Sequence, residues 1–252
     1  MEAPSAPPQR SGGGSVEISL LFLSFGVVLG YHAMYYFRIK REPGNTVFGF
    51  GNKVRGMWVE KIMSEPKNSI LGVQTMRNEL LVGQFLAQCS FVALSVVVGA
   101  STTTDLPSRL DALSAMDPLT GQDEPWVSPV LKLALLIALL AGVFLNCVQH
   151  LRLIKHVSMF VGCNTEEDKE KVTKTVSRMY NRSVVFFWVA MRLMLLLFPA
   201  VAWLFGPTYG FIAAVLAIVF MYCVDNLNMG EKKLHENVLR RTESGTIIVE
   251  KP

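Results

Sequence analysis

Four long hydrophobic segments, separated by polar and basic stretches, dominate the pattern of the chain. Residues 18–37, 80–104 and 133–151 contain no Asp, Glu, Lys or Arg, and 183–224 contains one, Arg192. A transmembrane helix needs about 20 mainly apolar residues. The first three segments therefore each predict one crossing, and the fourth is long enough for two.

The fourth segment contains a break where the chain can reverse direction. Gly206 and Pro207 follow each other there. Proline removes a backbone donor and glycine tolerates a turn. Backbone polar groups cannot stay unpaired in lipid, so each crossing should be helical. We predict an all-α integral membrane bundle, with crossings at about 18–37, 80–101, 130–151, 183–204 and 208–225.

The remaining segments complete the predicted organisation. Residues 16–230 should form a single membrane domain. The first 15 residues are rich in Pro, Gly and Ser, and we expect them to be disordered. The first crossing should act as a retained signal anchor, and residues 231–252 should form a flexible cytoplasmic tail.

The distribution of Lys and Arg predicts the orientation. Residues 38–79 hold eight Lys or Arg, residues 152–182 hold seven, and the tail from residue 225 holds five. The opposite side holds three. Because cytoplasmic loops carry the excess of Lys and Arg, we expect an N-terminus outside and a cytoplasmic C-terminus.

The two basic segments, 38–79 and 152–182, should be mainly helical. Residues 52–64 predict an interfacial helix with its apolar face toward the headgroups; packing of this face on the bundle is the alternative. The lipid-interface residues would be Trp58, Lys53, Arg55 and Lys61. We also expect the second, third and fourth crossing helices to extend into the cytoplasm, the second from Ser69 and the third to about Val161.

Composition narrows the function classes. The hydrophobic residues make up 51% of the chain and the charged residues 17%, whereas an average soluble domain has roughly a quarter charged residues. The four cysteines form no CxxC pair, so no zinc or redox spacing is present. The positive charge is explained by topology and by anionic lipid on the cytoplasmic side, so nucleic-acid binding is not expected. No pattern indicates a cofactor or an enzyme.

Polar residues inside the predicted crossings are the candidate functional residues. Arg192 is the tenth residue of its crossing, and a central Arg costs about 2.5–3.5 kcal/mol on insertion scales. It should therefore face the bundle or a water-filled cavity. Counting depth in the same way places other polar groups in the cytoplasmic half. The resulting intramembrane polar cluster is Arg192, Asp225, His32, Gln84, Gln88, Asn146, Gln149 and His150.

Three interpretations of this polar cluster remain open. The groups can be hydrogen-bonding contacts between helices, contributing about 0.6 kcal/mol each, in a non-enzymatic subunit or scaffold of a membrane assembly. They can instead line a cavity in which Arg192 serves a transporter or channel for a small solute or anion. An enzyme site built on His32, His150 and Asp225 is the third. We also expect Arg192 to pair with Asp225 or a polar group near it. Partners would be other membrane proteins or further copies of the chain.

Several stretches carry a resemblance to a known family. They are GYHAMYYFRIKREPGNTVFGF, WVEKIM, LGVQTMRNELL, and RLMLLLFPAVAWLFGP followed by YCVDN. The chain resembles the plant-type members of domain-of-unknown-function family 599 over roughly residues 25–230. The resemblance implies a polytopic membrane protein and no catalytic residues.

Overall fold

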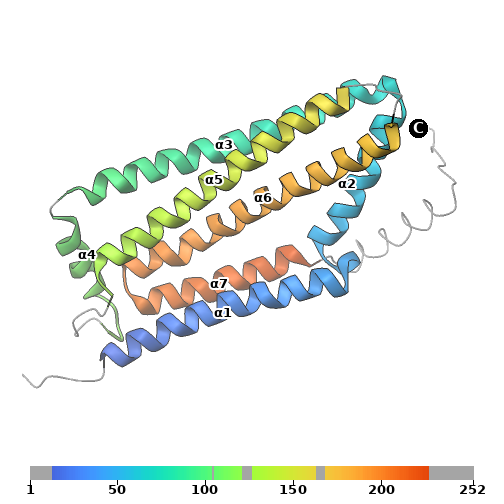
Figure 1. Ribbon diagram of the computed structural model, residues 1–252. Coiled ribbons are helices and arrows are strands. Elements are labelled where there is room, and N and C mark those ends of the chain that lie inside the picture. The colour runs from blue at the N-terminus through green and yellow to red at the C-terminus, as the bar shows by residue number, and fades with distance from the viewer. Residues whose placement is uncertain (1–12, 104, 121–126, 163–167, 227–252) are drawn as a thin grey trace, which may run out of the picture. The chain divides into compact units, whose positions relative to one another are not determined.

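The computed structural model describes residues 13–103, 105–120, 127–162 and 168–226 (Figure 1). These residues form α-helices joined by short turns and two 3-10 turns, η1 (Pro43–Asn45) and η2 (Pro66–Asn68). The α-helices are α1 (Gly13–Arg41), α2 (Val47–Ser64), α3 (Ser69–Ser101), α4 (Leu106–Ser114), α5 (Pro129–Gly162), α6 (Lys169–Leu204) and α7 (Pro207–Asp225).

Five of these helices, α1, α3, α5, α6 and α7, are long and apolar enough to cross a membrane. The protein is therefore an all-α, multi-pass membrane protein, as the hydrophobic segments predict. The second, third and fourth crossing helices are extended as expected, since α3 begins at Ser69, α5 ends at Gly162 and α6 begins at Lys169. The side of the membrane on which these extensions lie stays a prediction. The break between the last two crossings falls at Gly206, whose φ of 142° favours glycine.

Two local features go beyond the sequence-based expectation. The helix α4 lies between the second and third crossings, where the sequence pattern predicted no helix. The helix α2 begins at Val47, five residues before the predicted interfacial helix, because Thr46 caps it: the Thr46 hydroxyl accepts the Gly49 N–H at 3.2 Å. Most of the predicted disordered N-terminal segment and the whole tail 231–252 lie outside the described residues.

Contacts between Cα atoms divide the chain into two compact units. The first unit comprises the described residues within 1–29, 81–151 and 185–218. Its core has two hydrophobic clusters where α3, α5 and α6 pack together. Val143 and Cys147 of α5 meet Ala87 and Ala190 in one cluster. In the other, Leu136, Leu140 and Ala200 pack against partly buried residues of α3 and α6.

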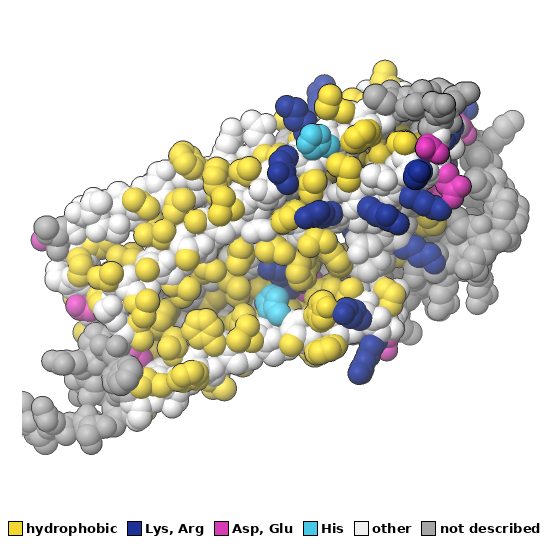
Figure 2. Space-filling model, viewed as in Figure 1, with side chains coloured by type: hydrophobic (Ala, Val, Ile, Leu, Met, Phe, Trp, Pro, Cys, Tyr) yellow, Lys and Arg dark blue, Asp and Glu magenta, His cyan; other side chains and the backbone are white. Residues whose placement is uncertain are grey.

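The second unit comprises the described residues within 30–80, 152–184 and 219–252. Its core joins α2 to its own parts of α3, α5 and α6, and includes Val59, Ile62, Met76, Ile154 and Val176. Most of the described Lys and Arg residues belong to this unit. On the face shown in Figure 2, their side chains gather over the second unit, while the surface of the first unit is mainly hydrophobic.

Candidate functional site

The residues of the predicted polar cluster divide between the two units. Gln84, Gln88, Asn146, Gln149, His150 and Arg192 belong to the first unit, and His32 and Asp225 belong to the second. The pairing of Arg192 with Asp225 thus concerns two separate units and stays a prediction.

Arg192 is a buried cation that lies on an aromatic ring. Its side chain is 6% exposed, and its Cζ atom lies 4.5 Å from the centroid of the Trp188 ring, one turn earlier on α6. An aromatic face attracts a guanidinium by about 2 kcal/mol or more where water is excluded. The ring therefore stabilises a charge that lipid alone would not accept.

His150 is fully buried between α3, α5 and α6. Its ring centroid lies 5.0 Å from that of Phe187 on α6. On the α3 side it faces Gly83, where an added Cβ would lie 2.7 Å from His150 Cδ2. The absence of a side chain at Gly83 therefore makes room for the imidazole.

The four amide residues of the first unit have different environments. Asn146 is half-buried and donates to the Gly142 carbonyl of its own helix at 2.8 Å. Gln149 is half-buried, whereas Gln84 and Gln88 are exposed. The last two do not join a common inward-facing layer, because the small residues Gly83 and Ala87 occupy the positions of α3 that face the core.

In the second unit, Asp225 connects α7 to α1. The buried Tyr31 hydroxyl donates to Asp225 Oδ2. The Tyr31 ring stacks on Tyr35 at 6.1 Å and meets the half-buried His32 edge-on at 5.6 Å. Next to Asp225, Asn226 forms an isolated antiparallel bridge with Thr46. These contacts join the end of α7 to α1 and to the start of α2.

The first unit also contains a second set of polar side chains, around Lys132, that was not expected from the sequence. Lys132, near the start of α5, is 2% exposed and Glu17, near the start of α1, is 3% exposed. The Lys132 ammonium donates to Ser114 Oγ at 3.0 Å and lies 5.6 Å from the Trp203 ring centroid. The negative charges of Glu17, Asp111 and Asp117 act on it. The available signal was that Glu17 and Lys132 carry opposite charges at the same predicted side of two crossings.

Asp117 holds the turn between α6 and α7. Its carboxylate accepts the Thr208 N–H at 3.0 Å and the Thr208 hydroxyl at 2.8 Å. It also accepts the N–H groups of Leu119 and Thr120. Burial opposes the charge on Asp117, but these hydrogen bonds outweigh it and lower the pKa of the carboxyl group. The carboxylate thus caps the N-terminus of α7, where the helix dipole favours negative charge.

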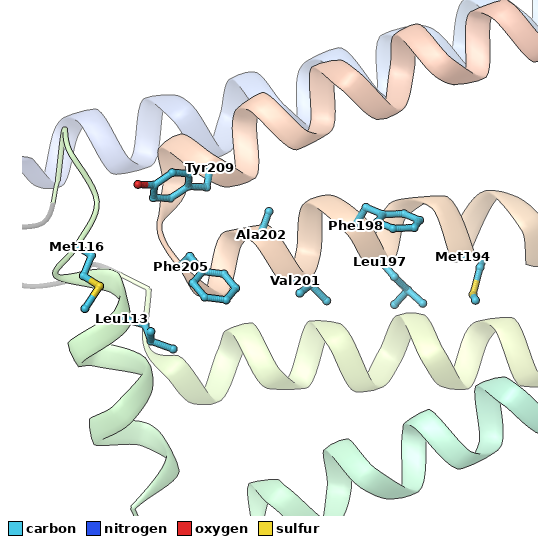
Figure 3. Close-up of a pocket in the computed structure, with 9 residues that line it drawn as sticks. All are labelled: Leu113, Met116, Met194, Leu197, Phe198, Val201, Ala202, Phe205 and Tyr209. Carbon is cyan, nitrogen blue, oxygen red and sulfur yellow. The ribbon is translucent and has the colours of Figure 1, made fainter.

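An apolar cavity of about 600 Å³ lies along α6 in the first unit (Figure 3). Residues from α4 or just after it, from α6 and from the start of α7 line it. None of them belongs to the predicted polar cluster. The lining residues are Leu113, Met116, Met194, Leu197, Phe198, Val201, Ala202, Phe205 and Tyr209.

The comparison with protein families gives one match. A family model described as "Protein of unknown function, DUF599" matches residues 19–228. The chain belongs to this family. No curated protein and no solved structure matches it. The family match confirms the resemblance carried by the sequence stretches, and it extends over most of the chain.

In this DUF599 protein, the apolar face of α2 packs inside the second unit. Ile62 is buried, and Trp58 lies 6.0 Å from the Tyr180 ring of α6, measured between centroids. The contacts of Trp58 and Ile62 thus correspond to the alternative expectation, packing on the bundle. Lys53 and Lys61 are exposed, and their contact with lipid headgroups stays a prediction.

Arg55 of α2 is half-buried and takes part in polar contacts within the same unit. Its Nε donates to Asn181 Oδ1 at 3.0 Å, and its guanidinium also contacts Asn52. Burial lowers the pKa of Arg55. The electrostatic influence of Tyr180 and Glu79 opposes this effect but is smaller, so the pKa lies below its ordinary value. Arg55 thus connects α2 to α6.

Proposed function

We propose that this DUF599 protein is a non-enzymatic subunit or scaffold of a membrane assembly. The environment of Arg192 carries the proposal. This charge is buried on the Trp188 ring, and the neighbouring Ala190, Leu193 and Met194 belong to or pack against a hydrophobic cluster. Such an environment is suited to a charged side chain that holds α6 in position against its neighbouring helices. It offers little polar surface to which a solute could bind.

Two cavities of the first unit support the same proposal. One has a volume of about 600 Å³ and a second about 120 Å³. Both are lined mainly by apolar side chains, and neither is lined by Arg192, Asn146 or His150. A path for a small anion would need polar side chains along a water-filled cavity that reaches Arg192.

In the proposed orientation, the N-terminus lies outside and the C-terminus lies in the cytoplasm. The basic side chains of the second unit would then face the cytoplasmic leaflet. Anionic lipids are concentrated in that leaflet and attract juxtamembrane Lys and Arg by about 1 kcal/mol per residue. Lys53 and Lys61, exposed on α2, are the residues best suited to this contact.

The test compares assembly with transport. The wild-type protein is purified from its native membrane in mild detergent, and its native mass is compared with the 28.0 kDa chain. Arg192→Lys and Arg192→Leu are measured beside it, with the exposed Arg109→Lys as control. We expect a mass above that of one chain for the wild type, and a lower Tm for Arg192→Lys, because an ammonium lacks the planar surface that stacks on Trp188.

A second measurement, of anion flux through the protein in liposomes, tests the transport hypothesis. The wild-type protein in liposomes would conduct anions, and Arg192→Lys would abolish the flux while keeping the fold. We expect no flux above protein-free liposomes. Flux that depends on Arg192 would contradict the proposed function.

A further inference from the structure

The end of α1 carries a groove in which cationic and apolar side chains lie next to each other. The groove has a volume of about 610 Å³, and its lining residues all belong to the second unit. They are Met34, Phe37, Arg38, Arg41 and Glu42. Unlike the two cavities of the first unit, this groove combines apolar side chains with two guanidinium groups.

All of these residues except Glu42 lie on one face of α1. At about 100° per residue, their positions fall within roughly 100° of the helix circumference. Lys40 lies about 100° or more from both arginines, and its ammonium is 4.6 Å from the centroid of the Tyr36 ring. The two arginines therefore share the groove, whereas the lysine between them in the sequence has a different contact.

The order of these residues along α1 matches the layers of a membrane. Residues 18–37 are uncharged, so Arg38 is the first charged residue after the hydrophobic segment. Met34 and Phe37 precede it and are 46% and 58% exposed. Arg41 lies about 4.5 Å farther along the helix axis, and a headgroup layer is roughly 5–7 Å thick. The apolar side chains thus match the depth of acyl chains, and both arginines match the depth of phosphates.

The charge of the two arginines is not used within the described part of the chain. Neither forms an ion pair with a residue that the structure describes, whereas Lys67 pairs with Glu65 at 3.1 Å. Glu42 also lines the groove, but its Oε2 accepts a hydrogen bond from Asn45 Nδ2 at 2.8 Å. With two arginines and one glutamate, the groove keeps a net positive charge that suits an anion.

We propose that this groove binds one anionic phospholipid. Its phosphate would lie on Arg38 and Arg41, and an acyl chain would lie along Met34 and Phe37. A guanidinium presents its N–H donors in a planar fork that matches two phosphate oxygens. The apolar side chains favour a lipid over a free anion, because only the lipid brings hydrocarbon to the same place.

This inference goes beyond the proposed function, since a lipid site at the end of α1 does not require an assembly. It also differs from the general attraction of anionic lipid to Lys53 and Lys61 of α2. That attraction depends on charge near the headgroups. The groove on α1 adds an apolar contact and a pair of guanidinium groups, and both can be tested.

The experiment is photo-cross-linking of the full-length protein in nanodiscs of phosphatidylcholine with a minor share of phosphatidylglycerol. Phe37 is replaced by benzoylphenylalanine, a photoreactive amino acid, and the cross-linked lipid is identified by mass spectrometry. Phe22, on the same helix and 70% exposed, is the matched control position. We expect phosphatidylglycerol to be enriched several-fold over its share of the nanodisc at position 37, and not at position 22.

Three variants in this background test the cations. Arg38→Gln and Arg41→Gln together should remove the enrichment at position 37. Lys40→Gln removes a charge from the same helix end and should leave most of the enrichment. Unchanged lipid adducts at position 22 show that each variant is still inserted in the bilayer. Equal loss for Arg38→Gln and Lys40→Gln, or no enrichment in the unmodified sequence around position 37, would overturn the site.

Excess inorganic phosphate separates a lipid from a free anion. We expect it to leave the adducts at position 37 unchanged, because phosphate makes no contact with Met34 or Phe37. Loss of the enrichment in phosphate would show that the groove binds a free anion and would overturn the lipid. An adduct with another protein, or with the chain itself, would overturn it too. The native mass of the protein does not enter this test, so the lipid site and the proposed assembly can fail separately.

Discussion

The Tyr31 hydroxyl of α1 donates a hydrogen bond to the Asp225 carboxyl group at the end of α7, although 194 positions separate the two residues. Both side chains are buried. A buried hydrogen bond to a carboxylate contributes about 1.5–3 kcal/mol. This one ties together the first and last helices of the second unit.

We expect Tyr31→Phe to lower the Tm of the purified protein, because it leaves the buried Asp225 carboxyl group without this donor. The matched control is Tyr36→Phe on the same helix, where the ring is 53% exposed and lies beneath the Lys40 ammonium. That variant should keep the wild-type Tm. Equal loss in the two variants would mean that the Tyr31 hydroxyl has no special role.

Gly206→Ala should destabilise the protein by about 1–3 kcal/mol, because an alanine at a φ of 142° is strained. The added Cβ would also lie 2.6 Å from Asp117 Cβ and overlap the carboxylate. Gly26→Ala on α1 is the control, since its Cβ would meet nothing within 4 Å and alanine favours a helix. Thermal unfolding in detergent should show loss for Gly206→Ala and no loss for Gly26→Ala.

The stability contributed by Asp117 should depend on pH. Its folded-state pKa is lowered by the hydrogen bonds from Thr208, Leu119 and Thr120. The contribution is therefore complete above the unfolded pKa of about 3.9 and is lost as the pH falls through the lower folded pKa. Between pH 6 and pH 3, the wild-type Tm should fall more steeply than that of Asp117→Asn. Parallel curves would show that Asp117 does not titrate differently in the two states.

Glycosylation acceptor sites added to each end of the chain should report the orientation. We expect a glycan on a site placed within residues 1–10 and none on a site placed at residues 243–245. The reverse pattern would contradict the proposed orientation. The natural glycosylation sequence at Asn181 is a poor reporter of orientation, because Asn181 lies within the helix α6 and not in a loop. Its side-chain oxygen also accepts a hydrogen bond from Arg55 of α2.

Replacing Lys53 and Lys61 together by glutamine should weaken the preference for anionic lipid, at about 1 kcal/mol for each charge near the headgroups. The control replaces Lys171 and Lys174, two exposed lysines near the start of α6. Binding of anionic lipid to the purified protein, measured by mass spectrometry, should fall more for the α2 pair. An equal fall would place the headgroup contact elsewhere.

Segment length and charge predicted the helices well because lipid leaves the backbone few alternatives. Residues 183–224 show this: the length requires two crossings, and Gly206 with Pro207 shows where they separate. The direction in which each helix turns its side chains was harder to predict. Lipid is as apolar as a protein core, so the pattern around α3 did not reveal that Gly83 and Ala87 face inward while Gln84 and Gln88 face outward.

Long-range polar contacts were missed for a different reason. Glu17, Asp117 and Lys132 lie at or beyond the ends of hydrophobic segments, where charged residues are ordinarily solvated. Only the path of the loop that contains α4 brings the Asp117 carboxylate to Thr208. The spacing of residues along the sequence does not predict a contact of this kind between distant residues.

The contact between Asp117 and Thr208 also bears on how the protein is made. A ribosome synthesises the α4 loop about 90 residues before the turn at Gly206. In the proposed orientation, with the N-terminus outside, the carboxylate that caps α7 has therefore already crossed the membrane when α6 and α7 emerge as a helical hairpin. When that hairpin inserts, the Asp117 carboxylate is already in place to accept the Thr208 N–H and hydroxyl. This contact can then fix the turn between the last two crossings as soon as they have inserted.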